Sequence, residues 1–133
     1  MSAPNIAAQG PVRFTTPIND IKVVDAVIAI NTDTSGTIDA RYRQILGLQM
    51  PAAWTAAGLY FEGSHDGTTF VNIFHGAAEY ELNAAAGAAA SSGISLDPEV
   101  FAPWPYVRIV SGAVALKVDQ LAARTIKVLT RAG

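Results

Sequence analysis

The chain has 133 residues, which fits one domain, and half of them are apolar. Only 15% are charged, below the roughly 25% that is usual for soluble domains, so we expect copies of the chain or a partner to cover part of the surface. A net charge of −2 argues against binding to nucleic acid, and no apolar run approaches the ~20 residues of a membrane span. The absence of cysteine excludes disulfides and thiolate metal sites, and two histidines exclude a histidine-rich site within one chain. We therefore expect no cofactor, no metal and no membrane partner.

The beginning of the chain is small, polar and interrupted by prolines, which predicts an extended arm over residues 1–17. Within it, residues 12–16 are typical of a short strand that Pro17 ends. We expect the arm to become ordered only against a neighbouring subunit. Residues 18–133 are expected to form one β domain.

Two strand regions follow the arm. Residues 21–31 predict a long strand because β-branched side chains dominate, and residues 31–36 have the composition of a turn. Residues 37–50 predict a second strand region in which Ile38, Ala40 and Tyr42 share the buried side. Gly47 suggests a bulge there.

A hairpin is the clearest local signal. Residues 59–62 and 69–74 are strand-like, and Asp66-Gly67 in the turn between them supplies the positive φ that reverses the chain. Leu59 and Phe61 should face the core. The partner register stays open, with either Phe70, Asn72 and Phe74 or Val71 and Ile73 facing inward.

The segment before this hairpin, residues 51–57, could form a helical turn or a loop carrying Trp54, and we prefer the loop. After the hairpin we expect a short strand at 79–82, an alanine-rich mobile loop at 84–92 and extended chain at 93–96. A helical turn capped by Asp97, a strand at 106–110, a turn at 111–113 and a last strand at 123–130 complete the list.

These elements predict the fold class. Seven or more short strands with turns every 8–15 residues, and no amphipathic helix, are typical of an all-β protein. We expect a single-domain antiparallel β-sandwich of jelly-roll type with an extended N-terminal arm.

Several residues have the types that catalysis or metal binding requires. Ser64-His65-Asp66 has the composition of a nucleophilic triad, but consecutive residues of a turn diverge, so we expect a polar turn. Residues 31–39 partly match a calcium loop, yet Tyr42 stands where a bidentate glutamate is required. A polar turn is the expectation there also.

The other candidates have structural interpretations as well. Glu79 and Glu81 would share one strand face, where paired carboxylates can act on a glycoside, but solvated side chains are the simpler explanation. His75 is expected to be a satisfied histidine at a strand end. We expect Arg108 and Arg124 to be paired or to lie at an interface. No enzyme activity is expected.

The aromatic residues leave one alternative open. Most alternate with polar residues in the phase of a strand and should fill the core. Trp54 and Trp104 lie in irregular segments and are the best candidates for exposure. Exposed indoles on a sandwich could stack on sugar rings.

The order of motifs over roughly residues 44–131 resembles a family of proteins. Met50-Pro51-Ala52-Ala53-Trp54 precedes a strand and Gly63-Ser64-His65-Asp66-Gly67, and Leu96-Asp97-Pro98 precedes Phe101-Ala102-Pro103-Trp104. Tyr106-Val107-Arg108-Ile109-Val110 and Ala123-Arg124-Thr125-Ile126 follow. This order resembles small structural proteins of tailed-bacteriophage virions, of the minor capsid or capsid decoration (cement) type. None of these motifs is a catalytic signature.

The resemblance implies a virion component, made in the host cytoplasm, on the outer capsid surface. Its partners would be the major capsid protein and the chain itself, with a homotrimer favoured, and it would bridge neighbouring capsid subunits. The alternative is a carbohydrate- or receptor-binding sandwich of a phage tail, baseplate or head fibre. The residues that we expect at the interface are Pro4, Asn5, Ile6, Val12, Arg13, Phe14, Trp54 and Trp104.

Overall fold

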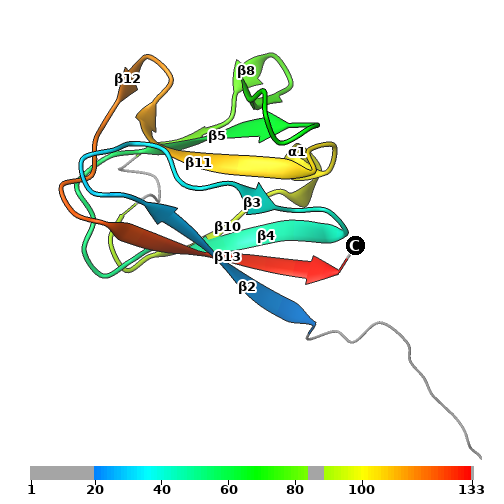
Figure 1. Ribbon diagram of the computed structural model, residues 1–133, viewed down its shortest axis with the longest axis horizontal. Coiled ribbons are helices and arrows are strands. Elements are labelled where there is room, and N and C mark those ends of the chain that lie inside the picture. The colour runs from blue at the N-terminus through cyan, green and yellow to red at the C-terminus, as the bar shows by residue number, and fades with distance from the viewer. Residues whose placement is uncertain (1–19, 84–88, 133) are drawn as a thin grey trace, which may run out of the picture.

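The computed structural model describes residues 20–83 and 89–132. Within these ranges the chain forms antiparallel strands and one short helix, which confirms the predicted all-β class (Figure 1). The predicted arm and the first part of the alanine-rich loop, residues 84–88, lie outside the described residues.

The first sheet holds four of the described strands in the order β10-β4-β13-β2. They are β10 (Gly93–Ser95), β4 (Arg43–Gln49), β13 (Arg124–Ala132) and β2 (Ile21–Ile28). β13 is a central strand, and it pairs antiparallel with β2 on one side and with β4 on the other. β2 is therefore an edge strand of this sheet.

The second sheet follows the order β12-β11-β5-β6, with β3 paired to β11 and β9 paired to β5. Its strands are β3 (Ile38–Asp39), β5 (Leu59–Ser64), β6 (Val71–Asn72), β9 (Glu81–Leu82), β11 (Tyr106–Ala113) and β12 (Leu116–Lys117). A separate small hairpin joins β7 (Phe74–His75) and β8 (Ala78–Glu79). In Figure 1, β5 and β11 lie in the upper part of the molecule, and β4, β13 and β2 lie in the lower part.

The two sheets share one hydrophobic core. The first sheet contributes Ala26, Ile28, Ile45, Leu48, Ile126 and Val128, and the second contributes Ile38, Leu59, Phe61, Val107 and Ile109. Phe101 of the helix packs edge-on against Phe61, with ring centroids 5.0 Å apart. Burying one such side chain contributes about 1.5–3 kcal/mol, so this shared core is a main source of stability.

A bulge in β4 explains why its hydrophobic pattern is irregular. Leu129 of β13 pairs with Gly47, but the next residue, Thr130, pairs with Ile45, so Leu46 is the extra residue. Ile45 and Leu48 are therefore both buried although they are three residues apart. The predicted bulge is confirmed.

The predicted strand over residues 37–50 is wrong as a single element. It is two strands in different sheets, β3 and β4, joined by a turn at Tyr42. Ile38 and Ala40 are buried as expected, but Tyr42 has a φ of 63° and is 86% exposed. The turn moves the chain across the core and rotates Tyr42 away from it.

The predicted hairpin at residues 59–74 is confirmed, with Glu62 opposite Asn72 and Gly67 at a φ of 80°. Neither of the two open registers holds along the whole run: Ile73 is buried, but Val71 of the same set is 49% exposed, and Phe74 of the other set is 54% exposed. The predicted strand at 79–82 is instead two short strands, β8 and β9. Each of these two strands pairs with a different partner.

The end of β11 differs from the prediction of a turn at residues 111–113. β11 continues to Ala113, and Gly112, at a φ of 113°, pairs with Lys117 of β12. A Cβ on Gly112 would lie 2.5 Å from the Leu116 carbonyl oxygen, so glycine is required by the close approach of β12.

The helix α1 (Pro98–Phe101) confirms the predicted helical turn. The Asp97 side chain accepts a hydrogen bond from the Glu99 N–H, and Pro98 occupies the start of the helix. Residues 51–57 form a loop, as preferred.

Candidate protein-binding surfaces

The outward face of β2 carries an apolar strip. Ile21, Val23 and Val27 are 39%, 54% and 46% exposed, while Ala26 and Ile28 on the opposite side are buried. Single exposed apolar residues are ordinary, but here three of them share one face of one strand. We call Ile21, Val23 and Val27 the β2 strip.

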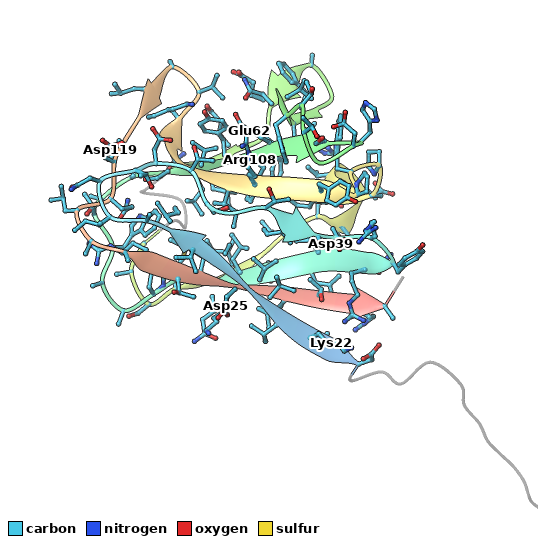
Figure 2. The ribbon with its side chains drawn as sticks, in the orientation of Figure 1. Lys22, Asp25, Asp39, Glu62, Arg108 and Asp119 are labelled. Atoms are coloured by element: carbon cyan, nitrogen blue, oxygen red, sulfur yellow. The ribbon has the colours of Figure 1, made fainter. Side chains whose placement is uncertain are left out.

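One charged residue interrupts the β2 strip. Asp25 stands between Val23 and Val27, and its Oδ1 accepts a hydrogen bond from Lys127 Nζ at 2.9 Å. Figure 2 shows Lys22 and Asp25 along β2. Both members of the Asp25–Lys127 pair are about half exposed, so the pair contributes little stability and neutralises the strip's one acidic group.

The outer edge of β2 is also available for contacts. Among the described residues, only its end has backbone partners on that side: Ile28 bridges Ser35, and the Gly36 N–H donates to the Val27 carbonyl at 3.1 Å. An exposed edge strand offers its backbone N–H and C=O groups to another chain. Strip and edge together form a surface suited to protein contacts.

Two further exposed apolar residues lie where two loops meet. The Asn31 N–H donates to the Gln120 carbonyl at 2.8 Å, and Ile30 and Leu121 are the chain neighbours of these two residues. The Ile30 and Leu121 side chains are 57% and 68% exposed. Neither residue was among the predicted interface positions, because a lone apolar residue beside a turn carries no periodic signal.

The two tryptophans are half-buried rather than exposed, so that expectation is wrong. Trp54 packs against the core, and its Nε1–H donates to the Ala57 carbonyl at 3.2 Å. Trp104 also packs against the core and lies directly over Gly63. The other predicted interface residues, Pro4, Asn5, Ile6, Val12, Arg13 and Phe14, lie outside the described residues.

Ser64, His65 and Asp66 form a polar turn, as expected. The Ser64 hydroxyl donates to Asp66 Oδ1 at 2.9 Å, and Ser64 Oγ accepts from the Gly67 N–H. His65 is exposed, with its Nε2 3.9 Å from Asp66 Oδ2. Backbone N–H groups of Thr68 and Thr69 lower the pKa of Asp66 to about 2. The Ser64 hydroxyl donates to the Asp66 carboxylate, whose lowered pKa makes it a weak base.

Glu79 and Glu81 do not form a pair on one strand. Glu79 lies on β8 opposite Phe74, and Glu81 lies on β9, where its Oε2 accepts from the Val114 N–H at 2.8 Å. The expectation that they share one strand face is wrong, because the chain changes pairing partner at Tyr80. His75 lies near Asp97, with Nε2 3.9 Å from Oδ2.

Both arginines are paired, as predicted. Arg108 Nη2 lies 2.7 Å from Glu62 Oε1. Arg124 donates through Nε to Gln120 Oε1 and through Nη2 to Thr55 Oγ1. Each guanidinium therefore has a structural role at a junction between elements.

No group of three or more histidine, aspartate or glutamate side chains that could hold a metal ion occurs in residues 20–83 and 89–132. The same ranges contain no helix that is long and apolar enough to cross a membrane.

A scan of protein-family models and a search of curated proteins both returned no match.

Proposed function

We propose that this protein is a non-enzymatic structural component of a bacteriophage virion, a capsid decoration protein that bridges and stabilises neighbouring major capsid subunits. The observation that carries the proposal is the β2 strip beside an exposed strand edge. Such a surface binds protein through apolar burial and backbone hydrogen bonds. On a capsid, many copies repeat one contact, so a modest interface suffices.

The chemistry of the polar residues supports the same proposal. Several of the groups that could act in catalysis are engaged in turns, caps and ion pairs. Ser64 bonds to Asp66, Glu81 holds the β12 hairpin, and Arg108 is paired with Glu62. A protein whose polar side chains stabilise its own turns suits a structural role.

We assign the two sheets to a β-sandwich of jelly-roll type. In support, the chain alternates between the sheets: β2 and β4 belong to the first, β3 and β5 to the second, and β10 and β13 again to the first. In the first sheet the strands that become neighbours are far apart in sequence, because β13 pairs with β2 and with β4, as in jelly rolls.

The alternative, a carbohydrate- or receptor-binding sandwich, loses its main motivation. It relied on Trp54 and Trp104 as exposed stacking platforms. Both indoles pack against the core, and the Trp54 Nε1–H donates a hydrogen bond to the Ala57 carbonyl. No other observation favours this alternative.

Add-back to particles tests the proposal. Particles from a phage strain lacking the gene are mixed with the purified protein, and bound protein is measured by co-sedimentation. We expect saturable binding and a rise in the temperature at which the particles release their genome. No binding, or binding with no gain in particle survival, would overturn the decoration role.

A double variant locates the contact. Val23→Lys with Val27→Lys places two charges on the β2 strip and should weaken binding by about 10- to 100-fold, since each buried valine contributes about 1.5 kcal/mol or more. Leu116→Lys is the matched control, because Leu116 is 72% exposed and lies on β12 of the second sheet. Equal binding of the double variant and the control would exclude the strip as the contact.

A further inference from the structure

A hollow of about 320 Å³ lies beside the turn between β3 and β4. One wall is this turn, and the other is the segment from α1 to the start of β11. Phe101, Trp104, Pro98 and Pro105 supply much of the apolar lining. A cavity of roughly 150 Å³ accepts a benzene ring, so this hollow can hold an aromatic side chain with a neighbouring residue.

Tyr42 stands at the rim in a costly conformation. Its φ of 63° lies in the left-handed region, which costs a non-glycine residue about 1–3 kcal/mol, yet its side chain is 86% exposed. No burial of this ring in the described residues compensates the backbone strain. A strained backbone that presents an exposed tyrosine beside an apolar hollow is a feature of binding sites.

The charged side chains of the hollow are already neutralised. Arg41 is held by Asp39 through Nη2–Oδ2 at 2.7 Å and Nε–Oδ1 at 3.0 Å. Arg43 Nη1 lies 3.5 Å from Asp20 Oδ2. Because both guanidinium groups have partners, the hollow suits an uncharged, apolar occupant rather than an acidic one.

The Trp104 wall is fixed in position. Its ring lies against Gly63 of β5 so closely that a Cβ on Gly63 would be 2.6 Å from it. The indole is half-buried on the core side. An occupant of the hollow would therefore meet a preformed aromatic surface, which lowers the entropic cost of binding.

The described chain begins beside a residue that lines this hollow. Asp20 is its first residue, and Arg43, which lines the hollow, contacts it twice: through the ion pair and through a hydrogen bond from Nη2 to the Asp20 carbonyl at 3.3 Å. The segment that precedes Asp20 is therefore joined to the described chain next to Arg43. It carries a single aromatic residue, Phe14, six positions from Asp20 and within about 20 Å of extended chain.

The geometry points to this hollow as the docking site for the chain's own N-terminal segment, with Phe14 as the anchor beside Tyr42 and Trp104. A segment tethered this close has an effective concentration in the millimolar range, which exceeds that of a second copy in dilute solution. Docking covers the arm's apolar residues in the free protein and leaves them available when a stronger partner competes. This inference does not depend on the virion role.

Paramagnetic relaxation tests the docking in the full chain. The protein has no cysteine, so Thr16→Cys gives one site for a nitroxide label. We expect the label to broaden the indole N–H signal of Trp104, which a Trp54→Phe variant assigns. A Trp104 signal that is not broadened would overturn the proposal.

Isotopic mixing separates the possible occupants. When ¹⁵N-labelled protein without nitroxide is mixed with unlabelled protein that carries it, we expect no broadening of Trp104. Broadening in this mixture would identify the arm of a second copy as the occupant and overturn docking within one chain.

Two variants test the anchors, both measured with the Thr16→Cys label. Phe14→Ala should abolish the broadening, and Tyr42→Gly should reduce it while relieving the strained φ. Asn31→Gly is the matched control, because Asn31 also has a positive φ (62°) but lies outside the hollow. Undiminished broadening in Phe14→Ala would overturn Phe14 as the anchor, and undiminished broadening in Tyr42→Gly would remove Tyr42 from the site.

Discussion

Arg108 and Glu62 face each other across β11 and β5, with Nη2 2.7 Å from Oε1 (Figure 2). The Arg108 guanidinium carbon also lies 3.8 Å from the centre of the Phe70 ring. Arg108 therefore makes both an ion pair and a cation–π contact. Arg108 Nε is buried and has no hydrogen-bond partner in the structure. The strand-borne arginine of the motif order is therefore part of a packed cluster that joins β5, β11 and the turn before β6.

A double-mutant cycle on this pair should give a clear coupling. Glu62 and Arg108 side chains are 14% and 31% exposed, so solvent screens the pair only in part. We expect Glu62→Ala and Arg108→Ala to be coupled by about 1–2 kcal/mol in urea unfolding. The same cycle on the exposed pair Asp39 and Arg41 is the control and should give a weaker coupling. Equal coupling energies would contradict the role of burial.

Gln120 is the polar residue on which three segments converge, and replacing it should be costly. It is fully buried, its Oε1 accepts from the Thr55 N–H, and its Nε2 donates to the Thr55 carbonyl and to Ser111 Oγ. Gln120→Ala leaves these groups unsatisfied and should lower the free energy of unfolding by about 2–4 kcal/mol. Gln49→Ala is the control, because Gln49 is exposed on β4, and the free energy of unfolding should change by no more than ~0.5 kcal/mol. A small effect at Gln120 would mean that the junction does not stabilise the fold.

The contact between Gly63 and Trp104 predicts that even one methyl group disturbs the hollow. Gly63→Ala would place a Cβ 2.6 Å from the indole, so Trp104 must move. We expect a loss of about 1–3 kcal/mol and a red shift of the tryptophan emission. In Gly93→Ala nothing lies within 4 Å of the added Cβ, and both quantities should stay near the wild-type values. Identical spectra of the two variants would show that Trp104 does not lie on Gly63.

Local chemistry made several elements predictable. Asp97 and Pro98 together specify a helix start, and Asp66-Gly67 specify a reversal, because each needs only neighbouring residues. Gly47 signalled the bulge for the same reason. In each case the backbone conformation that the residue itself favours determines the local structure.

The predictions are wrong where contacts with segments distant in the sequence determine the local structure. Tyr42 continues an alternating pattern, but the chain must cross from one sheet to the other there, and a positive φ turns the ring outward. Ser111 and Gly112 resemble a turn, but β12 folds back on them and extends the strand. The sequence did not predict the β2 strip. Apolar β-branched residues on both faces of a strand indicate that both faces are buried, whereas only one face of β2 packs against the core.

The turn at Ser64 makes stability depend on pH in a defined direction. Backbone N–H groups of Thr68 and Thr69 and the Ser64 hydroxyl lower the pKa of Asp66 to about 2, against about 3.9 in the unfolded chain. Because the folded state binds the proton less readily, this contribution is fully present above about pH 4 and is lost as the pH falls toward 2. Subtracting the unfolding curve of Asp66→Asn, which keeps an acceptor oxygen but cannot ionise, from that of the parent should isolate a difference that shrinks over this window. A difference that stays constant between pH 5 and pH 2 would show that the Asp66 carboxylate is not held by the turn.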